Sequence, residues 1–257
     1  MRPRLKSKEE IETLREGGRR HAEILGELAR QIKPGVSTLI LEEEASRLIR
    51  EYGDKPAFLG YQPRGARVPY PAVLCVSIND EIVHGIPNVK ERIIREGDIV
   101  SIDLGLIHNG LITDSAITVP AGKIDDESQR LIDTARIALE RGIEQARLGN
   151  TTGDIGAVIS EVVAKSGFTL ASDLSGHGVG YAVHEDPYVP NFGIRGDGEE
   201  LVQGLVIAIE PMVNAQGPKI KLMNDGYTIK TKDGSRSAHF EHTVAITKTG
   251  NIILTSL

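Results

Sequence analysis

The feature that most constrains the fold is a pattern that occurs twice. In each half, a long helical pattern is interrupted, resumes as a second helical pattern and ends at a glycine. At an offset of 114 residues, Gly35 aligns with Gly149 and Gly53 with Gly167. Coincidence is the alternative, since glycine commonly follows helices. We favour an internal duplication within a single domain of residues 1–257, with halves of about 1–122 and 123–257. A functional site would then lie between the halves.

The helices are predicted from apolar residues spaced three, four and seven positions apart. They cover residues 7–32, 38–52, 126–147 and 152–166. Ser7, with Glu10 three residues later, forms a capping-box pattern at the first helix. Between the helices lie short segments rich in Val and Ile, which predict strands at 72–78, 98–107, 111–119, 205–209, 240–247 and 251–254. This arrangement predicts an α+β protein with an antiparallel sheet core and outer helices.

The clearest strand pair is joined through Asn109-Gly110, a strong signal for a two-residue hairpin loop. Such a loop places Gly105 opposite Asp114, and Asp103 then shares a sheet face with Asp114. The two carboxylates would lie diagonally, ~7–8 Å apart between backbones. Buried together, they would repel each other unless a cation lay between them. From the hairpin alone, a solvated sheet face with Lys or Arg partners is the more common alternative.

Other acidic and histidine residues occur at the ends of apolar segments. His177 lies in the glycine-dense stretch 175–180, and His184 follows seven residues later. Glycines permit the close backbone approach and unusual dihedrals that active-site loops need. Glu210 ends an apolar strand, Glu241 enters another, and His84 follows a third. Each alone is more often a structural residue or a salt-bridged strand end, so only their combination is informative.

Composition and charge limit the function classes. The formal net charge of −6 gives no electrostatic reason to expect nucleic acid or anionic membrane as a partner. The single cysteine excludes an internal disulfide and suits a reducing compartment. The charged N-terminus is not a secretory signal, and no segment approaches the roughly 18 apolar residues of a membrane span. We therefore expect a cytoplasmic protein.

Taken together, these positions closely resemble the type I methionine aminopeptidases, from about Ser7 to the end of the chain. That family has the pita-bread fold, in which two pseudo-symmetric halves surround a dinuclear metal site. The resemblance implies the metal ligands Asp103, Asp114, His177, Glu210 and Glu241. It also implies catalytic and substrate-binding roles for His84 and His184, which match two further active-site histidines of the family.

The ligand set agrees with this resemblance on chemical grounds. Four carboxylates and one imidazole are hard ligands that suit two divalent ions such as Co, Mn, Fe or Zn. The resemblance implies that a hydroxide bridging the two metals attacks the scissile peptide carbonyl. It also implies that Glu210 is catalytic as a proton shuttle, and that His84 and His184 stabilise the intermediate and position the peptide.

The resemblance further implies the substrate and its pocket. The substrate would be the N-terminal methionine of nascent proteins with a small second residue, met at the ribosome by a monomeric enzyme. Its side chain would contact Phe58, Tyr61, Tyr70, Cys75 and Tyr227. Tyr227 stands where the family usually has tryptophan, and Val183 where some members have an aromatic residue. The segment 62–69 looks longer than in compact members. Ordinary core packing is the alternative for Phe58 and Tyr61.

Other classes of protein fit less well. Only 26 positions separate His184 from Glu210, which leaves no room for the helical insert of a type II enzyme. An X-Pro peptidase would carry a large N-terminal domain, whereas this chain begins almost at the first helix. A non-enzymatic relative would have lost ligands that are all present here. Cys75 lies in an apolar strand, where thiols are usually inert, so a cysteine hydrolase is disfavoured. Residues 176–180 open no helix and are not a dinucleotide fingerprint.

Overall fold

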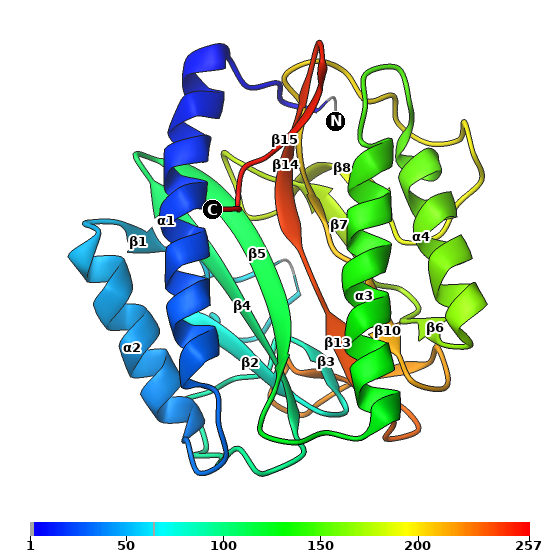
Figure 1. Cartoon of the computed structure of the whole chain (residues 1–257). Coiled ribbons are helices and arrows are strands. Elements are labelled where there is room, and N and C mark those ends of the chain that lie inside the picture. Colours follow the sequence, from blue (N-terminus) through cyan, green and yellow to red (C-terminus); the bar gives the residue numbers. More distant parts are fainter. Residues whose placement is uncertain (1–2, 64) are drawn as a thin grey trace.

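The computed structural model describes residues 3–63 and 65–257. Helices cover the outer faces of antiparallel sheets, which confirms the predicted α+β class (Figure 1). The helices are α1 (Lys8–Gln31), α2 (Thr38–Glu51), α3 (Asp126–Gln145) and α4 (Thr152–Ser166). Their bounds agree with the sequence predictions to within about two residues, and the capping box of Ser7 and Glu10 is present. No helix in the described ranges is long and apolar enough to cross a membrane.

The strands form two larger and two smaller sheets within the described residues. In the first half they are β1 (Lys55–Pro56), β2 (Leu74–Ile78), β3 (Glu81–Val83), β4 (Ile99–His108) and β5 (Leu111–Pro120). In the second half they are β6 (Thr169–Leu170), β7 (Ser175–Gly178), β8 (Glu185–Pro190), β9 (Val206–Ile209), β10 (Met212–Asn214), β11 (Ile220–Leu222), β12 (Ile229–Thr231), β13 (Ser237–His239), β14 (His242–Thr247) and β15 (Gly250–Ile253). β4 pairs with β1, β2 and β5, and the second larger sheet has the order β15-β14-β9-β7-β8.

The β4–β5 hairpin has the predicted register. Asn109 and Gly110 form the loop with φ values of 49° and 84°, and Gly105 lies opposite Asp114. Both loop residues adopt the left-handed conformation that tight hairpins require. The two aspartates therefore face the same side of the sheet, as predicted.

Several short strands, among them β3, β8 and β12, had no predicted counterpart, and two further differences concern the site. Residues 175–178 form strand β7 instead of a loop. The predicted strand 240–247 is divided, because β13 ends at His239 and β14 begins at His242. Between them, Glu241 pairs with Ala116 of β5: its N–H donates to the Ala116 carbonyl at 2.9 Å. The chain thus leaves its pairing with β10 after His239, and Glu241 pairs instead with β5 in the first half.

Two separate apolar cores lie beneath the helices. α1 and α2 cover one core that includes residues of β2 and β4, and α3 and α4 cover another that includes residues of β9 and β14. Hydroxyl groups join the halves where β5 meets β14. The Thr243 hydroxyl donates to the Asp114 carbonyl at 2.7 Å and accepts from its N–H at 2.8 Å. The Ser115 hydroxyl donates to the Glu241 carbonyl at 2.8 Å. These bonds fix Asp114 beside Glu241.

Candidate metal centre and pocket

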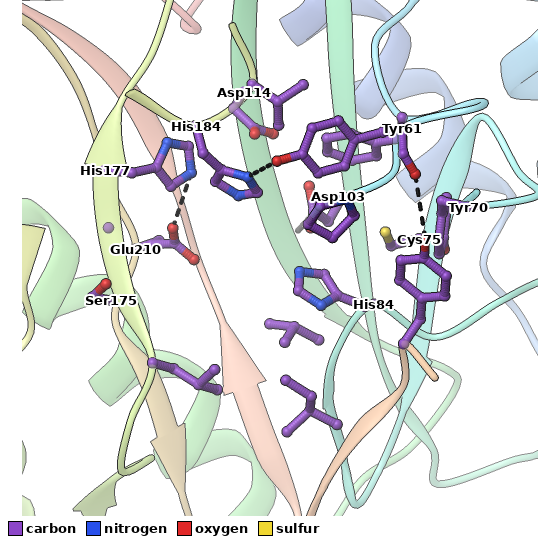
Figure 2. Close-up of a pocket in the computed structure, with 18 of the residues that line it drawn as sticks. Tyr61, Tyr70, Cys75, His84, Asp103, Asp114, Ser175, His177, His184 and Glu210 are labelled. Atoms are coloured by element: carbon purple, nitrogen blue, oxygen red, sulfur yellow. Dashed lines mark hydrogen bonds and ion pairs between the residues drawn. The ribbon is translucent and has the colours of Figure 1, made fainter. Parts of the chain in front are cut away.

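The predicted metal ligands come from both halves and line one cavity of about 630 Å³. Asp103 lies on β4, Asp114 on β5 and His177 on β7, while Glu210 follows β9 and Glu241 precedes β14. Figure 2 shows His177, His184 and Glu210 on one side of the cavity, and Asp103, Cys75, Tyr61 and Tyr70 on the other. All the predicted catalytic and pocket residues line this same cavity.

The ligand atoms form two overlapping groups. Oxygen or nitrogen atoms of Asp114, His177 and Glu241 lie within 4.8 Å of one another, and so do those of Glu210, His239 and Glu241. Glu241 belongs to both groups. His177 Nε2 lies 3.3 Å from one Glu210 oxygen, and His239 Nε2 lies 3.4 Å from the other. Two cation positions sharing one carboxylate would fit this arrangement.

Burial and mutual repulsion change the protonation of these side chains. Burial raises the pKa of Asp103 to about 7 and, together with the Asp103 charge, raises the pKa of Asp114 well above its usual range. The pKa values of Glu210 and Glu241 are raised chiefly by burial. Burial lowers the pKa of His177 to about 3, so its imidazole is neutral at neutral pH. Neutral imidazole is the form that binds metals.

Unpaired buried oxygens indicate that the centre fits a cation. Within the described part of the chain, Oδ1 of Asp103, Oδ1 of Asp114 and Oε1 of Glu241 have no hydrogen-bond partner. Buried polar atoms are nearly always paired, and an unpaired one costs about 1–3 kcal/mol. A bound cation would satisfy these oxygens and relieve the repulsion between the carboxylates.

The glycines beside His177 explain why a glycine-dense sequence forms a strand. A Cβ at Gly176 would lie 2.3 Å from the Ala208 carbonyl oxygen, and one at Gly178 would lie 2.2 Å from that of Asp186. Glycine therefore lets β9 and the Glu185–Asp186 segment lie directly against β7. The predicted loop is a strand at residues 175–178, but the close backbone approach expected of these glycines is present.

Both further histidines face the cavity. His84 follows β3 with a φ of 59°, an uncommon conformation for a residue with a side chain. Burial lowers its pKa to about 4. The His184 ring lies edge-on to that of His177, with 4.4 Å between centroids, and its Nδ1 lies 2.6 Å from the Tyr61 hydroxyl. The pKa of His184 is also lowered by desolvation. Both rings are therefore neutral at neutral pH.

Aromatic rings form the pocket wall. Tyr70 makes edge contacts with Phe58 and Tyr227, with centroids 6.5 Å and 5.1 Å apart. The Tyr70 hydroxyl donates to the carbonyls of residues 74 and 85, at 3.3 Å and 3.2 Å. Cys75 is buried beside Asp103, and burial raises the pKa of its thiol well above the usual range. A protonated thiol is a weak nucleophile, which counts against a cysteine hydrolase.

One residue at the centre was missed from the sequence. His239 is buried, and within the described residues neither ring nitrogen makes a hydrogen bond. It stands two positions before Glu241, so period-two alternation would have placed the two side chains on one face. That signal was available in the Ser237–His242 segment.

Comparison with known proteins identifies the family. The model of metallopeptidase family M24 matches residues 12–248. This chain is a member of metallopeptidase family M24. Within that family it is 50% identical to a methionine aminopeptidase of Aquifex aeolicus, with 98% of each chain covered. It is 42% identical to methionine aminopeptidase 1 of Bacillus subtilis, covering 97% of this chain and 98% of the relative. The resemblance to methionine aminopeptidases is thus confirmed.

Solved structures confirm the pita-bread fold of this M24 protein. The crystal structure of a methionine aminopeptidase from Thermotoga maritima matches with a TM-score of 0.95 and 39% identity, and both chains are covered completely. A prolidase from Pyrococcus horikoshii matches with a TM-score of 0.76 and 22% identity, covering 98% of this chain and 63% of the prolidase. The second likeness shows the fold alone. Membership of a metallopeptidase family also implies the use of divalent metal.

Proposed function

We propose that this M24 protein is a methionine aminopeptidase that removes the initiator methionine from nascent proteins whose second residue is small. The observation that carries the proposal is the convergence of four carboxylates and a neutral imidazole at the base of a largely apolar, aromatic-walled cavity. The methionine aminopeptidases of Aquifex aeolicus and Bacillus subtilis, to which the chain is similar over nearly its whole length, support the same activity.

The proposed metal ligands are Asp103, Asp114, His177, Glu210 and Glu241. Their unpaired oxygens and the shared position of Glu241 support a site for two divalent ions, of which Co, Mn, Fe and Zn all suit the ligand set. When bound, such ions would supply Lewis-acid chemistry, polarising the scissile carbonyl and lowering the pKa of a water between them. His239 Nε2 lies 3.4 Å from the second Glu210 oxygen, and we propose that it donates a hydrogen bond to this oxygen in the metal-bound enzyme.

Glu210 and the two neutral histidines would move and hold protons around the substrate. Burial raises the pKa of Glu210, so its carboxylate readily accepts a proton and can return it to the leaving amine. His84 and His184 would each donate an N–H to the substrate, because a neutral imidazole carries one ring proton. Their places on the cavity lining support these catalytic roles.

The pocket walls favour an unbranched apolar side chain. Phe58, Tyr70, Cys75 and Tyr227 are buried residues of one apolar cluster, with Tyr61 packed against it. A methionine thioether is flexible and polarisable and fills such a pocket without leaving a polar group unpaired. A lysine ammonium in the same place would be desolvated without a partner.

The cellular setting completes the proposal. We propose that the enzyme acts in the cytoplasm as a monomer, on N-terminal peptides that emerge from the ribosome, without a requirement for nucleic acid. The net charge of −6 and the single buried cysteine are consistent with that setting. We also propose that the two helix pairs with their sheets, residues 1–122 and 123–257, derive from one duplicated unit within a single catalytic domain.

Metal removal tests the proposed function. Protein purified without added metal is treated with chelator until elemental analysis finds no transition metal. Release of methionine from a Met-Ala-Ser peptide should then cease, and it should return on addition of Mn, Fe or Co but not of buffer alone. Full activity in protein shown to be metal-free would contradict the proposal.

A further inference from the structure

The described residues from Tyr61 to Tyr70, 61–63 and 65–70, form a segment along one wall of the cavity. Its ends are joined by backbone hydrogen bonds, from the Tyr70 N–H to the Tyr61 carbonyl at 2.8 Å and from the Gly60 N–H to the Tyr70 carbonyl at 2.9 Å. Residues 63, 65 and 66 line the cavity. The position of Tyr61 therefore depends on how this closed segment is held.

Tyr227 holds the segment from the other half of the chain. Its hydroxyl donates to the Val68 carbonyl at 2.5 Å and lies 3.3 Å from the Tyr61 carbonyl. Tyr227 belongs to a turn in which the Asp225 carboxylate accepts the N–H groups of Tyr227 and Thr228, each at 2.9 Å. A phenylalanine ring could pack equally well at this position, but only a polar group can reach the two carbonyls.

Tyr61 in turn contacts a proposed catalytic side chain. Its hydroxyl lies 2.6 Å from His184 Nδ1. A phenol that donates to Nδ1 holds the proton of a neutral imidazole on Nε2.

We propose that Tyr227 is a positioning residue that acts through Tyr61 to keep His184 in the tautomer with its proton on Nε2. The inference rests on the proposed function, in which His184 donates a hydrogen bond to the substrate. It gives the tyrosine at position 227 a role for its hydroxyl that packing alone does not provide.

A double-mutant cycle with Tyr61→Phe and Tyr227→Phe tests the inference. Each change removes one hydroxyl and keeps the ring. We expect Tyr61→Phe to lower kcat for Met-Ala-Ser by about 10-fold, as for one buried hydrogen bond left unmade. Tyr227→Phe should lower kcat by a smaller factor. If Tyr227 acts through Tyr61, the double variant should lose no more than Tyr61→Phe alone.

The tautomer itself provides a second measurement that does not depend on turnover. In protein labelled with ¹⁵N-histidine, the Nδ1 and Nε2 signals of His184, assigned with His184→Asn, should shift toward a mixture of tautomers in both phenylalanine variants. Tyr52→Phe is the matched control, since the Tyr52 hydroxyl, at the end of α2, donates to Glu23 of α1, and neither residue lines the cavity. That variant should change thermal stability but neither kcat nor the His184 signals.

Two results would overturn the inference. One is a double variant whose loss in kcat equals the product of the two single losses, because Tyr227 would then act independently of Tyr61. The other is an unchanged His184 spectrum in Tyr227→Phe. If the wild-type enzyme releases no methionine, the proposed function fails instead, and the spectra still decide whether Tyr227 sets the tautomer.

Discussion

The metal centre and the pocket wall share one cavity but are built in different ways. Asp103, Asp114 and His177 lie on paired strands, where register and alternation determine which side chains meet. Tyr61 and Tyr227 lie outside the strands and meet through a hydroxyl and backbone carbonyls. The centre is thus fixed by sheet geometry, and the wall by contacts between turns that are distant in sequence.

This difference has consequences for substitution. A change at the centre removes a charge or a ligand from strands that hold their positions, so it should reduce both metal affinity and the rate of the reaction. A change in the wall should leave metal binding intact and alter turnover or affinity. The following changes test that separation, in order of decreasing effect.

The largest effect is expected for Asp103→Asn. The variant should fold, because removing one buried charge relieves repulsion in the metal-free protein. Its kcat/KM should fall by more than about 10⁴-fold, as for residues that act as one catalytic unit, and calorimetry should find weaker metal binding. Asp126→Asn, an exposed change in the first turn of α3, is the control. Near-normal activity of Asp103→Asn would place the centre elsewhere.

His184→Ala should reduce turnover and leave the metal in place. We expect a loss of roughly 10²–10⁴-fold in kcat, the range for positioned polar or acid–base groups. Elemental analysis should find the same metal content as in wild type, since His184 is not among the proposed ligands. Loss of one equivalent of metal would show that His184 is a ligand and belongs to the metal centre.

His239 should behave as part of the centre. Replacement by leucine removes the nitrogen that lies 3.4 Å from Glu210 and should weaken metal binding by about 10–100-fold. Replacement by glutamine keeps an N–H donor and should restore most of the affinity. Equal affinities in the leucine variant and wild type, measured by titration calorimetry, would show that His239 has no part in holding Glu210.

The smallest effect concerns the stability of the metal-free protein. Burial raises the pKa of Asp103 to about 7 and that of Glu241 well above its usual range. The folded chain thus binds more protons than the unfolded chain, and its stability falls as pH rises through these values. The buried histidines, whose pKa values are lowered, act in the opposite direction but only below about pH 6.5.

Calorimetry between about pH 6.5 and 7.5 therefore isolates the carboxylates, because the Cys75 thiol, whose pKa burial also raises, ionises in the unfolded chain only nearer pH 8.5. The unfolding temperature of metal-free protein should fall across this window, by roughly 2–4 °C for each kcal/mol lost. Asp103→Asn should lessen the fall, and bound metal should reverse it, because metal binding displaces protons. A flat or rising curve in metal-free wild type would contradict the raised pKa values.

The sequence predicted the parts of the molecule that depend on local pattern. The Asn109-Gly110 loop fixed the register that places Asp103 and Asp114 on one face. The two-residue spacing of His239 and Glu241 also indicated that both side chains share a face, but His239 was not predicted as a site residue. The strand at 175–178 could not be predicted, because its glycines are needed where the backbones of Ala208 and Asp186 lie against it, and these contacts form only in the folded protein. The contact of Tyr227 with residues 61 and 68 likewise depends on tertiary structure. The ligand roles themselves stay predictions.

Substrate preference tests the central claim most directly. The measurement is kcat/KM for Met-Ala-Ser, Lys-Ala-Ser and Met-Leu-Ser peptides with one metal-loaded preparation. The apolar pocket predicts that the methionyl peptide with alanine next is cleaved at least about 10²-fold better than the lysyl peptide, because a buried ammonium would lack a partner. The proposed small-residue rule predicts that Met-Leu-Ser is also cleaved poorly. Equal cleavage of Met-Ala-Ser and Lys-Ala-Ser would contradict the methionine pocket and with it the proposed activity.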